Sequence, residues 1–345
     1  MANDRLEIIR DYIKAHPQSS STEIFEGTGR MAAYATVRRD LARLVADGDL
    51  LVTGRGKASR YTLSPAYELL SPVDVDAYFA LETDQRRIKD NYNFSLIDTL
   101  SAVPLFSRTE TEYLDTLQAE FAANVSQLSA ARYRKEMERL GIDLSWKSSQ
   151  IEGNTYSLLE TERLLLEKET AAGKSKDEAV MLLNHKDALD FILDDPDYMR
   201  VLTVAKIENI HSILVKELNV DRNIRVRRVG ITGTNYRPLD NEFQIREALN
   251  ETCRLVNGRE TVFEKALLLL LLISYIQPFN DGNKRTARIV SNAVLIASGY
   301  CPLSFRTVDS IDYKKAILLF YEQNSIAAFK RIFIEQFAFA VKTYF

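Results

Sequence analysis

The chain has 345 residues, enough for two or three domains, and a formal net charge of −3. Its 46% hydrophobic and 27% charged residues are typical of globular packing. The absence of a signal peptide or a membrane-length apolar run predicts a soluble cytoplasmic protein with no membrane partner. Two cysteines, Cys253 and Cys301, are too few for a disulfide framework and predict reduced thiols.

Residues 1–66 show a pattern of three helices followed by a β-hairpin. DRLEIIRDYIKAHP is an amphipathic helix that stops before Pro17, and SSTEIFEGTG opens a short helix with a capping box. AYATVRRDLARLVADGDL gives a third helix that stops at Gly48, and LLVTGRGKASRYTLS alternates about a glycine turn as a hairpin does. This order resembles a winged helix-turn-helix domain.

Basic residues gather on the third helix and the hairpin of this domain. Up to Pro65, Lys and Arg outnumber Asp and Glu by ten to eight, whereas the rest of the chain is acidic. The predicted DNA-contacting residues are Arg38, Arg39, Arg43, Arg55, Lys57 and Arg60. Winged helices also dock proteins, so DNA and a protein partner both stay open.

Residues 67–142 read as a helical linker region that leads into a core domain at 143–300. In WKSSQIEGNTYSL, Gly153 or Asn154 is the expected helix C-cap, which places Glu152 in the last helical turn. A carboxylate there opposes the negative end of the helix dipole, so it either needs a cation or is simply solvated. VRRVGITGTNYRPLD, at 226–240, predicts a β-hairpin that is either a binding flap or a structural hairpin. The histidines have no metal-like spacing, and His211 is interpreted as a packed helix residue.

A polar bend lies between two apolar segments at 276–289. FEKALLLLLLISYI predicts a buried helix that Pro278 ends, and KRTARIVSNAVLIASGY predicts a second helix. Free N–H groups and the dipole at the start of the second helix attract anions, which accounts for the otherwise unfavourable Arg285 and Arg288 in its first turns. Asp281 beside phosphate oxygens suits Mg²⁺. The bend therefore predicts a di- or triphosphate cradle, with a corner of solvated arginines as the alternative.

Residues 301–345 predict two further amphipathic helices packed on the core. The predicted fold class is mainly α, with the hairpin at 226–240 and the N-terminal domain as its β elements.

The bend resembles the active-site motif of the Fic (Fido) family, H-x-F-x-[DE]-G-N-G-R-x-x-R. The matching residues are Phe279, Asp281, Gly282, Asn283, Arg285 and Arg288. The resemblance implies a Fic-type helical core that binds ATP and Mg²⁺ and transfers AMP to a hydroxyl of an unidentified target protein. It also implies that Asp281 holds Mg²⁺, that Asn283 and the amides around Gly282 hold phosphates, and that both arginines grip the β and γ phosphates.

Two residues depart from this motif, and each bears on the chemistry. Gln277 stands where the family has its histidine base, and an amide takes up no proton near neutral pH. Losing a positioned base forfeits about 10²–10⁴ in rate. Lys284 replaces the second glycine of the motif and resembles the Doc branch, which phosphorylates its targets; it counts among the predicted nucleotide-binding residues. AMP transfer, nucleotide sensing coupled to DNA binding without efficient transfer, and Doc-like phosphoryl transfer all stay open.

Two further segments extend the resemblance. Ser148, Glu152 and Gly153 resemble the family's inhibitory motif [ST]-x-x-x-E-[GN], which implies a brake that acts through Arg288 from a helix N-terminal to the active-site motif. The hairpin at 226–240 resembles the family flap, which holds the target by strand addition. Its predicted target-contacting residues are Ile231, Thr232, Gly233 and Thr234. The sequence leaves a homo-oligomer open.

Overall fold

In the computed structural model, which describes residues 2–345, the chain divides after Pro72 into two compact units. This division falls inside the predicted linker 67–142, a little beyond the boundary expected at residue 66. The boundaries expected at residues 142 and 300 separate no compact units, because helix α8 (Ala130–Ile151) runs through the first of them. Linker, core and C-terminal helices are thus parts of one unit.

The first unit contains three helices, a two-stranded hairpin and a short closing helix. Its elements are α1 (Ala2–Ala15), α2 (Ser21–Gly27), α3 (Tyr34–Ala46), β1 (Leu50–Thr53), η1 (Gly56–Ala58), β2 (Arg60–Leu63) and α4 (Pro65–Leu70). Strands β1 and β2 pair antiparallel with Leu50 opposite Leu63, and the predicted capping box between Ser20 and Glu23 opens α2. Apolar side chains of the three helices and β1 share one buried core. The assignment to the winged helix-turn-helix class stays a prediction.

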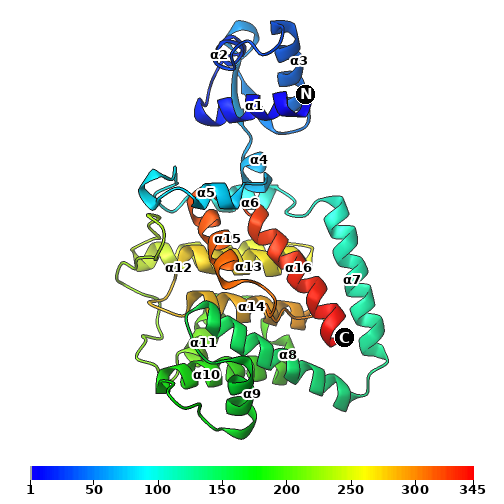
Figure 1. Cartoon of the computed structure of the whole chain (residues 1–345), viewed down its shortest axis with the longest axis vertical. Coiled ribbons are helices and arrows are strands. Elements are labelled where there is room, and N and C mark those ends of the chain that lie inside the picture. The colour runs from blue at the N-terminus through cyan, green and yellow to red at the C-terminus, as the bar shows by residue number, and fades with distance from the viewer. Residues whose placement is uncertain (1) are drawn as a thin grey trace. The chain divides into compact units, whose positions relative to one another are not determined.

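The second unit is built almost entirely of helices (Figure 1). Its first elements are α5 (Val75–Phe79), η2 (Thr83–Gln85), α6 (Leu96–Ala102), α7 (Arg108–Ser126), α8 (Ala130–Ile151), α9 (Leu158–Glu167) and α10 (Lys176–Asp194). Its remaining elements are η3 (Pro196–Met199), α11 (Val204–Leu214), α12 (Glu242–Gly258), α13 (Val262–Ile276), α14 (Asn283–Ala297), α15 (Ser310–Gln323) and α16 (Ala327–Tyr344). The mainly α class is confirmed.

Helix α13 forms the centre of the second unit because it is apolar on all sides. Every residue from Ala266 to Ile276 except the small polar Ser274 is hydrophobic, and all are buried. The predicted buried helix is thus confirmed. Helix α14 packs against α13, and α8, α10 and α11 pack on α14, as Figure 1 shows in yellow, orange and green. Within residues 2–345, no helix is long and apolar enough to cross a membrane.

The β-hairpin expected at 226–240 does not form. These residues contain no strand, and an isolated parallel bridge joins Arg237 to Asn91. The buried Arg225 explains the difference: its guanidinium donates hydrogen bonds to the carbonyl oxygens of Gln277 (2.6 Å), Arg227 (2.8 Å) and Leu239. A single side chain therefore ties together both ends of the segment and the 277–282 loop, where cross-strand backbone pairs were predicted. We keep the name flap for residues 226–240.

Candidate functional site

The loop 277–282 between α13 and α14 is held in shape by the side chain of Asn283. Its Oδ1 accepts the N–H of Phe279 (2.8 Å), and its Nδ2 donates to the carbonyl of Phe279 (2.8 Å) and to Oε1 of Gln277 (3.0 Å). Asn283 is 5% exposed, so these three bonds use its amide inside the loop. The side chain predicted to hold phosphate thus fixes the backbone, and its own N–H group lies in the first turn of α14.

Gln277 caps α13 in a left-handed conformation with φ +51°, which turns the chain sharply before Pro278. Its amide nitrogen donates to the carbonyl of Ser274 at 2.7 Å and lies 3.4 Å from the hydroxyl of Tyr321. Gln277 is 8% exposed, and it lines the cleft described below. The amide at the position of the predicted base is therefore a packed structural group that takes up no proton.

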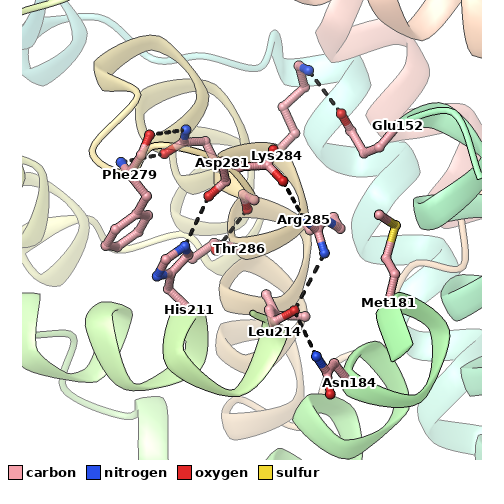
Figure 2. Close-up of polar contacts among 12 residues, drawn as sticks. Glu152, Met181, Asn184, His211, Leu214, Phe279, Asp281, Lys284, Arg285 and Thr286 are labelled. Carbon is pink, nitrogen blue, oxygen red and sulfur yellow. Dashed lines mark hydrogen bonds and ion pairs between the residues drawn. The ribbon is translucent and has the colours of Figure 1, made fainter. Parts of the chain in front are cut away.

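His211 supports the same loop from α11. Its ring stacks on Phe279 with centroids 3.6 Å apart, which buries both rings. Its Nε2 lies 3.0 Å from the carbonyl oxygen of Asp281, and its Nδ1 lies 3.2 Å from that of Arg222. Burial lowers the pKa of His211 although both carbonyls favour the protonated ring. The packed role predicted for His211 is confirmed, and its contact with the loop is a link that sequence reasoning missed (Figure 2).

The first turn of α14 contains residues of the predicted phosphate site. The N-cap is Gly282 with φ +79°, which has no side chain to bond the first N–H groups of the helix. Beside it the carboxylate of Asp281 is 63% exposed and accepts a 3.0 Å hydrogen bond from Arg285, whose side chain is 1% exposed. Burial lowers the pKa of Arg285, and the neighbouring Asp281 carboxylate works against that effect.

These residues fit a nucleotide phosphate with Mg²⁺. Nε of Arg285 and Nη1 of Arg288 are buried and lack a hydrogen-bond partner among residues 2–345. Mg²⁺ in nucleotide sites uses one or two carboxylates together with phosphate oxygens and water, and Asp281 supplies one such carboxylate. Within the described residues no cluster of three metal-ligating side chains exists, so a metal ion here depends on the phosphates for further ligands.

Glu152, at the C-cap of α8, is held between two cations of α14. Its Oε1 accepts from Nη2 of Arg288 at 2.7 Å and its Oε2 from Nζ of Lys284 at 3.0 Å; Figure 2 shows the Lys284 contact. Burial alone would raise the pKa of Glu152, but the charges of Arg288 and Lys284 outweigh it and lower the pKa to about 2. Gly153 follows with φ +103°, which ends the helix as predicted.

Arg288 has further partners beyond Glu152. Its side chain is fully buried, donates to the hydroxyl and the carbonyl of Ser148 at 2.7 and 2.9 Å, and lies over the ring of Tyr313 at 5.2 Å. Ser148 and Glu152 therefore meet the same guanidinium, and the inhibitory role of this segment stays a prediction. The contact of Lys284 with Glu152 was not predicted, because no sequence pattern joins residues 132 positions apart.

A cleft of about 350 Å³ lies beside these groups, and the predicted Arg285, Arg288 and Ser148 are buried behind its wall and do not line it. From the predicted site, Glu152, Gln277, Asp281, Gly282, Asn283 and Lys284 line it, and the flap contributes Val229, Gly230, Ile231 and Thr232. Gly233 and Thr234 do not line it. The sequence reasoning missed Asn280 and the exposed Lys314 of α15, which line the same cleft; the basic Lys314-Lys315 pair was the available signal. The size suits a small-molecule ligand.

The predicted DNA-contacting residues lie in the first unit. Arg38, Arg39 and Arg43 are exposed on α3, Arg55 and Lys57 are exposed between the two strands, and Arg60 begins β2 and is half-buried. Arg43 also forms an exposed ion pair with Asp47 at 3.5 Å. The unit thus presents cations from a helix and from the adjoining turn.

Comparison with known proteins assigns the central part of the chain. Residues 201–295 match the family described as Fic/DOC. The chain is 28% identical over 239 residues to "Protein adenylyltransferase Fic" of Nematostella vectensis, covering 64% of this chain and 52% of the relative. It is 27% identical over 190 residues to a protein of the same name from Aedes aegypti, covering 52% and 37% respectively. The chain therefore spans about half of the length of the first relative and about a third of the second.

Solved structures agree in fold. "Fic-1 (aa134 - 508) from C. elegans" matches with a TM-score of 0.61 at 20% identity, covering 72% of this chain and 80% of the other. A "Fic domain containing signaling protein" from Bacteroides thetaiotaomicron matches with a TM-score of 0.57 at 21% identity, covering 67% and 95%. Sequence match and fold therefore define a helical domain. That domain, matched at residues 201–295, is a Fic/Fido domain.

Proposed function

We propose that the chain binds ATP with Mg²⁺ in the cleft and belongs, by its chemistry, with the proteins that transfer AMP to a hydroxyl of a target protein. The single observation that carries this proposal is the Glu152–Arg288 pair at 2.7 Å, in which a carboxylate that lines the cleft pairs with a buried cation of α14. The relatives' name, protein adenylyltransferase, supports the reaction class.

The residues of the cleft divide the work as follows. The N–H groups at the start of α14 bind phosphate oxygens, because Gly282 leaves them uncapped. Arg285 and Arg288 place positive charge near these phosphate oxygens. Asp281 holds Mg²⁺, which neutralises phosphate charge when bound. Asn283 contributes its N–H group, while its side-chain amide keeps the loop in shape.

Glu152 acts as a brake because it occupies the cations that a terminal phosphate needs. If Arg288 moved away, the carboxylate of Glu152 would stay partly buried and would lose a partner that keeps its pKa low. The cost of that unpaired charge holds the two residues together. Lys284 holds the other carboxylate oxygen, so two cations are withdrawn from the ligand at once. We infer that release of Glu152 frees both.

Gln277 favours a second candidate function, a nucleotide sensor without efficient transfer. Its amide nitrogen is bonded to Ser274 and its oxygen to Asn283, so the position supplies no proton acceptor. In this version ATP occupancy of the Fic domain changes the affinity of the first unit for DNA or a docking protein. Equal affinity with and without MgATP excludes it.

The test uses Glu152→Gly with and without Gln277→His, and with MgATP labelled at the α or the γ phosphate. Label on protein in a host lysate is the readout. We expect the rate of α-label transfer in the double variant to exceed that in Glu152→Gly by a factor of about 10²–10⁴, because a positioned general base accelerates a reaction by about that factor. Label from γ alone would identify Doc-like phosphoryl transfer. No label in either variant, with MgATP bound, would establish the sensor.

Binding of the nucleotide is tested separately with Asp281→Ala. We expect this variant to weaken MgATP binding strongly and to leave binding of Mg²⁺-free ATP less affected, because the lost carboxylate belongs to the metal site. Asp240→Ala is the matched control, since its exposed carboxylate pairs with Arg228 of the flap and does not line this cleft. Unchanged MgATP affinity in Asp281→Ala would contradict the proposal.

A further inference from the structure

A segment outside the Fic/DOC match holds the flap. Residues 83–91, which we call the strap, precede the matched residues 201–295 by more than a hundred positions. The N–H of Arg237 donates to the carbonyl of Asp90 at 2.8 Å, and the same flap residue forms the parallel bridge to Asn91. The strap therefore lies along the C-terminal half of the flap.

Arg86 is the one buried cation of the strap and makes its central contact. One nitrogen, Nη2, donates to the carbonyl of Gly233 at 2.8 Å and to the hydroxyl of Thr83 at 2.8 Å. The other, Nη1, lies 3.1 Å from Oε1 of Glu322, which is fully buried in α15. Tyr78 donates a further hydrogen bond of 2.7 Å to this carboxylate. The guanidinium fork thus spans from a core carboxylate to the flap backbone.

The bond to Gly233 sets the direction of the flap turn. Gly233 has φ +89°, and a Cβ there would lie 3.4 Å from Leu318 of α15. The carbonyl that Arg86 fixes follows directly after Ile231 and Thr232, two of the flap residues that line the cleft. Helix α15 supplies both Glu322, which pairs with Arg86, and Leu318, which lines the cleft. One helix therefore contacts both the residue that holds the flap and the cleft.

We propose that Arg86 is a positioning residue that fixes the flap for the target segment. The inference rests on the proposed function, since it assigns the fixed surface to the protein that presents the acceptor hydroxyl. The flap has no ladder of its own strands, so Arg86 supplies the order that a hairpin would otherwise supply. A flap ordered in advance spares the complex the entropy of ordering it during binding. Arg86 touches neither nucleotide site residues nor the loop 277–282.

The decisive variant is Arg86→Lys. It keeps a positive charge beside Glu322, so the buried carboxylate stays paired, but a lysine lacks the planar fork that reaches both Glu322 and the carbonyl of Gly233. Arg87→Lys is the matched control, because Arg87 is the exposed neighbour. Should Arg86→Lys unfold, Asn235→Ala replaces it; that change removes the exposed 2.8 Å bond from the flap to Asp84.

Hydrogen exchange gives the first readout. We expect the amides of Tyr236 and Arg237, which donate to the hydroxyl of Thr234 and to the carbonyl of Asp90, to exchange about tenfold faster in Arg86→Lys, the ratio that corresponds to one lost hydrogen bond. Amides of α13 and α14 should exchange as in the unchanged chain. Unchanged exchange across the flap would overturn the proposal.

Transfer gives the second readout and separates positioning from a general loss of structure. In the Glu152→Gly, Gln277→His background, Arg86→Lys should lower the rate of labelling of lysate proteins about tenfold or more and leave the half-saturating ATP concentration unchanged. A change of the same size in the half-saturating ATP concentration would overturn the positioning role. A background that binds no MgATP refutes the proposed function instead, and the exchange result then still decides whether Arg86 orders the flap.

Discussion

Replacing Glu152 by glutamine removes the negative charge between Arg288 and Lys284 and keeps the shape of the side chain. The pKa of Glu152 falls from 4.5 to about 2 in the folded chain. At about 1.4 kcal/mol per pKa unit, the ionised carboxylate stabilises the fold by about 3 kcal/mol at pH 7. Breaking a buried ion pair costs about 3–5 kcal/mol, which agrees. We therefore expect Glu152→Gln to lower the free energy of unfolding by about 3 kcal/mol.

The same shift fixes the pH dependence. A depressed carboxylate pKa stabilises the fold fully above about pH 4.5, and this contribution is lost as the pH falls toward 2. The difference between the unchanged chain and Glu152→Gln should therefore shrink over that interval and stay constant above it.

The assay is urea unfolding followed by fluorescence of Trp146, the single tryptophan of the chain, which lies in α8 of the second unit. The control is Glu167→Gln, whose partner Arg163 and own side chain are both 63% exposed, so we expect a change below about 0.5 kcal/mol. MgATP at about a hundred times its Kd should add about 2.7 kcal/mol to the stability of Glu152→Gln, because a ligand that binds only the folded chain shifts the unfolding equilibrium toward it. Equal urea midpoints for Glu152→Gln and the unchanged chain would refute the reasoning.

Three further predictions concern other parts of the chain. Burial and the charges of Arg288 and Arg285 hold the pKa of His185 well below 6.5, so on acidification the unfolded chain is protonated at His185 before the folded chain is. The free energy of unfolding should therefore fall as the pH drops below about 6.5. His185→Leu should reduce this fall in urea midpoints measured from pH 7 to 5, and an unchanged slope would contradict the prediction. Burial raises the pKa of Cys253 to about 11 and that of Cys301 above its usual range; neither thiol should be alkylated in the folded chain at pH 8, whereas both should react in urea, as mass spectrometry can show. Removing exposed cations of α3, by Arg38→Ala or Arg39→Ala, should weaken binding to duplex DNA and make the slope of log K against log salt shallower by about one for each residue; an unchanged slope in both variants would favour the protein-docking alternative.

Local patterns predicted the parts of the fold that local interactions determine. The buried run of α13, the stop at Pro278 and the capping box at Ser20 each depend on residues within a few positions of one another. The phosphate site was inferred from equally local features, the free N–H groups at the start of a helix and Arg285 and Arg288 three positions apart, and it stays a prediction.

The misses are contacts between distant segments. The flap was predicted as a hairpin from its glycines and β-branched residues, but Arg225 and Arg86 compete for its carbonyl groups. Neither arginine belongs to a turn or strand signal. A local sequence pattern therefore cannot predict that these side chains bind the carbonyl groups of the flap. The Lys284–Glu152 pair and the place of Lys314 in the cleft were missed likewise, because they depend on how α8 and α15 pack beside α14.

The sequence distance between Glu152 and Arg288 has a consequence for how the protein folds. Asn283 closes the loop 277–282 through contacts four to six positions apart, whereas the Glu152–Arg288 bond spans 136 positions. Short-range contacts form with little loss of chain entropy, while long-range contacts wait for the surrounding helices to assemble. We therefore expect α13, α14 and the loop between them to form early in refolding, before Glu152 pairs with Arg288. The chain should then bind its ligand during refolding before Glu152 can act as a brake.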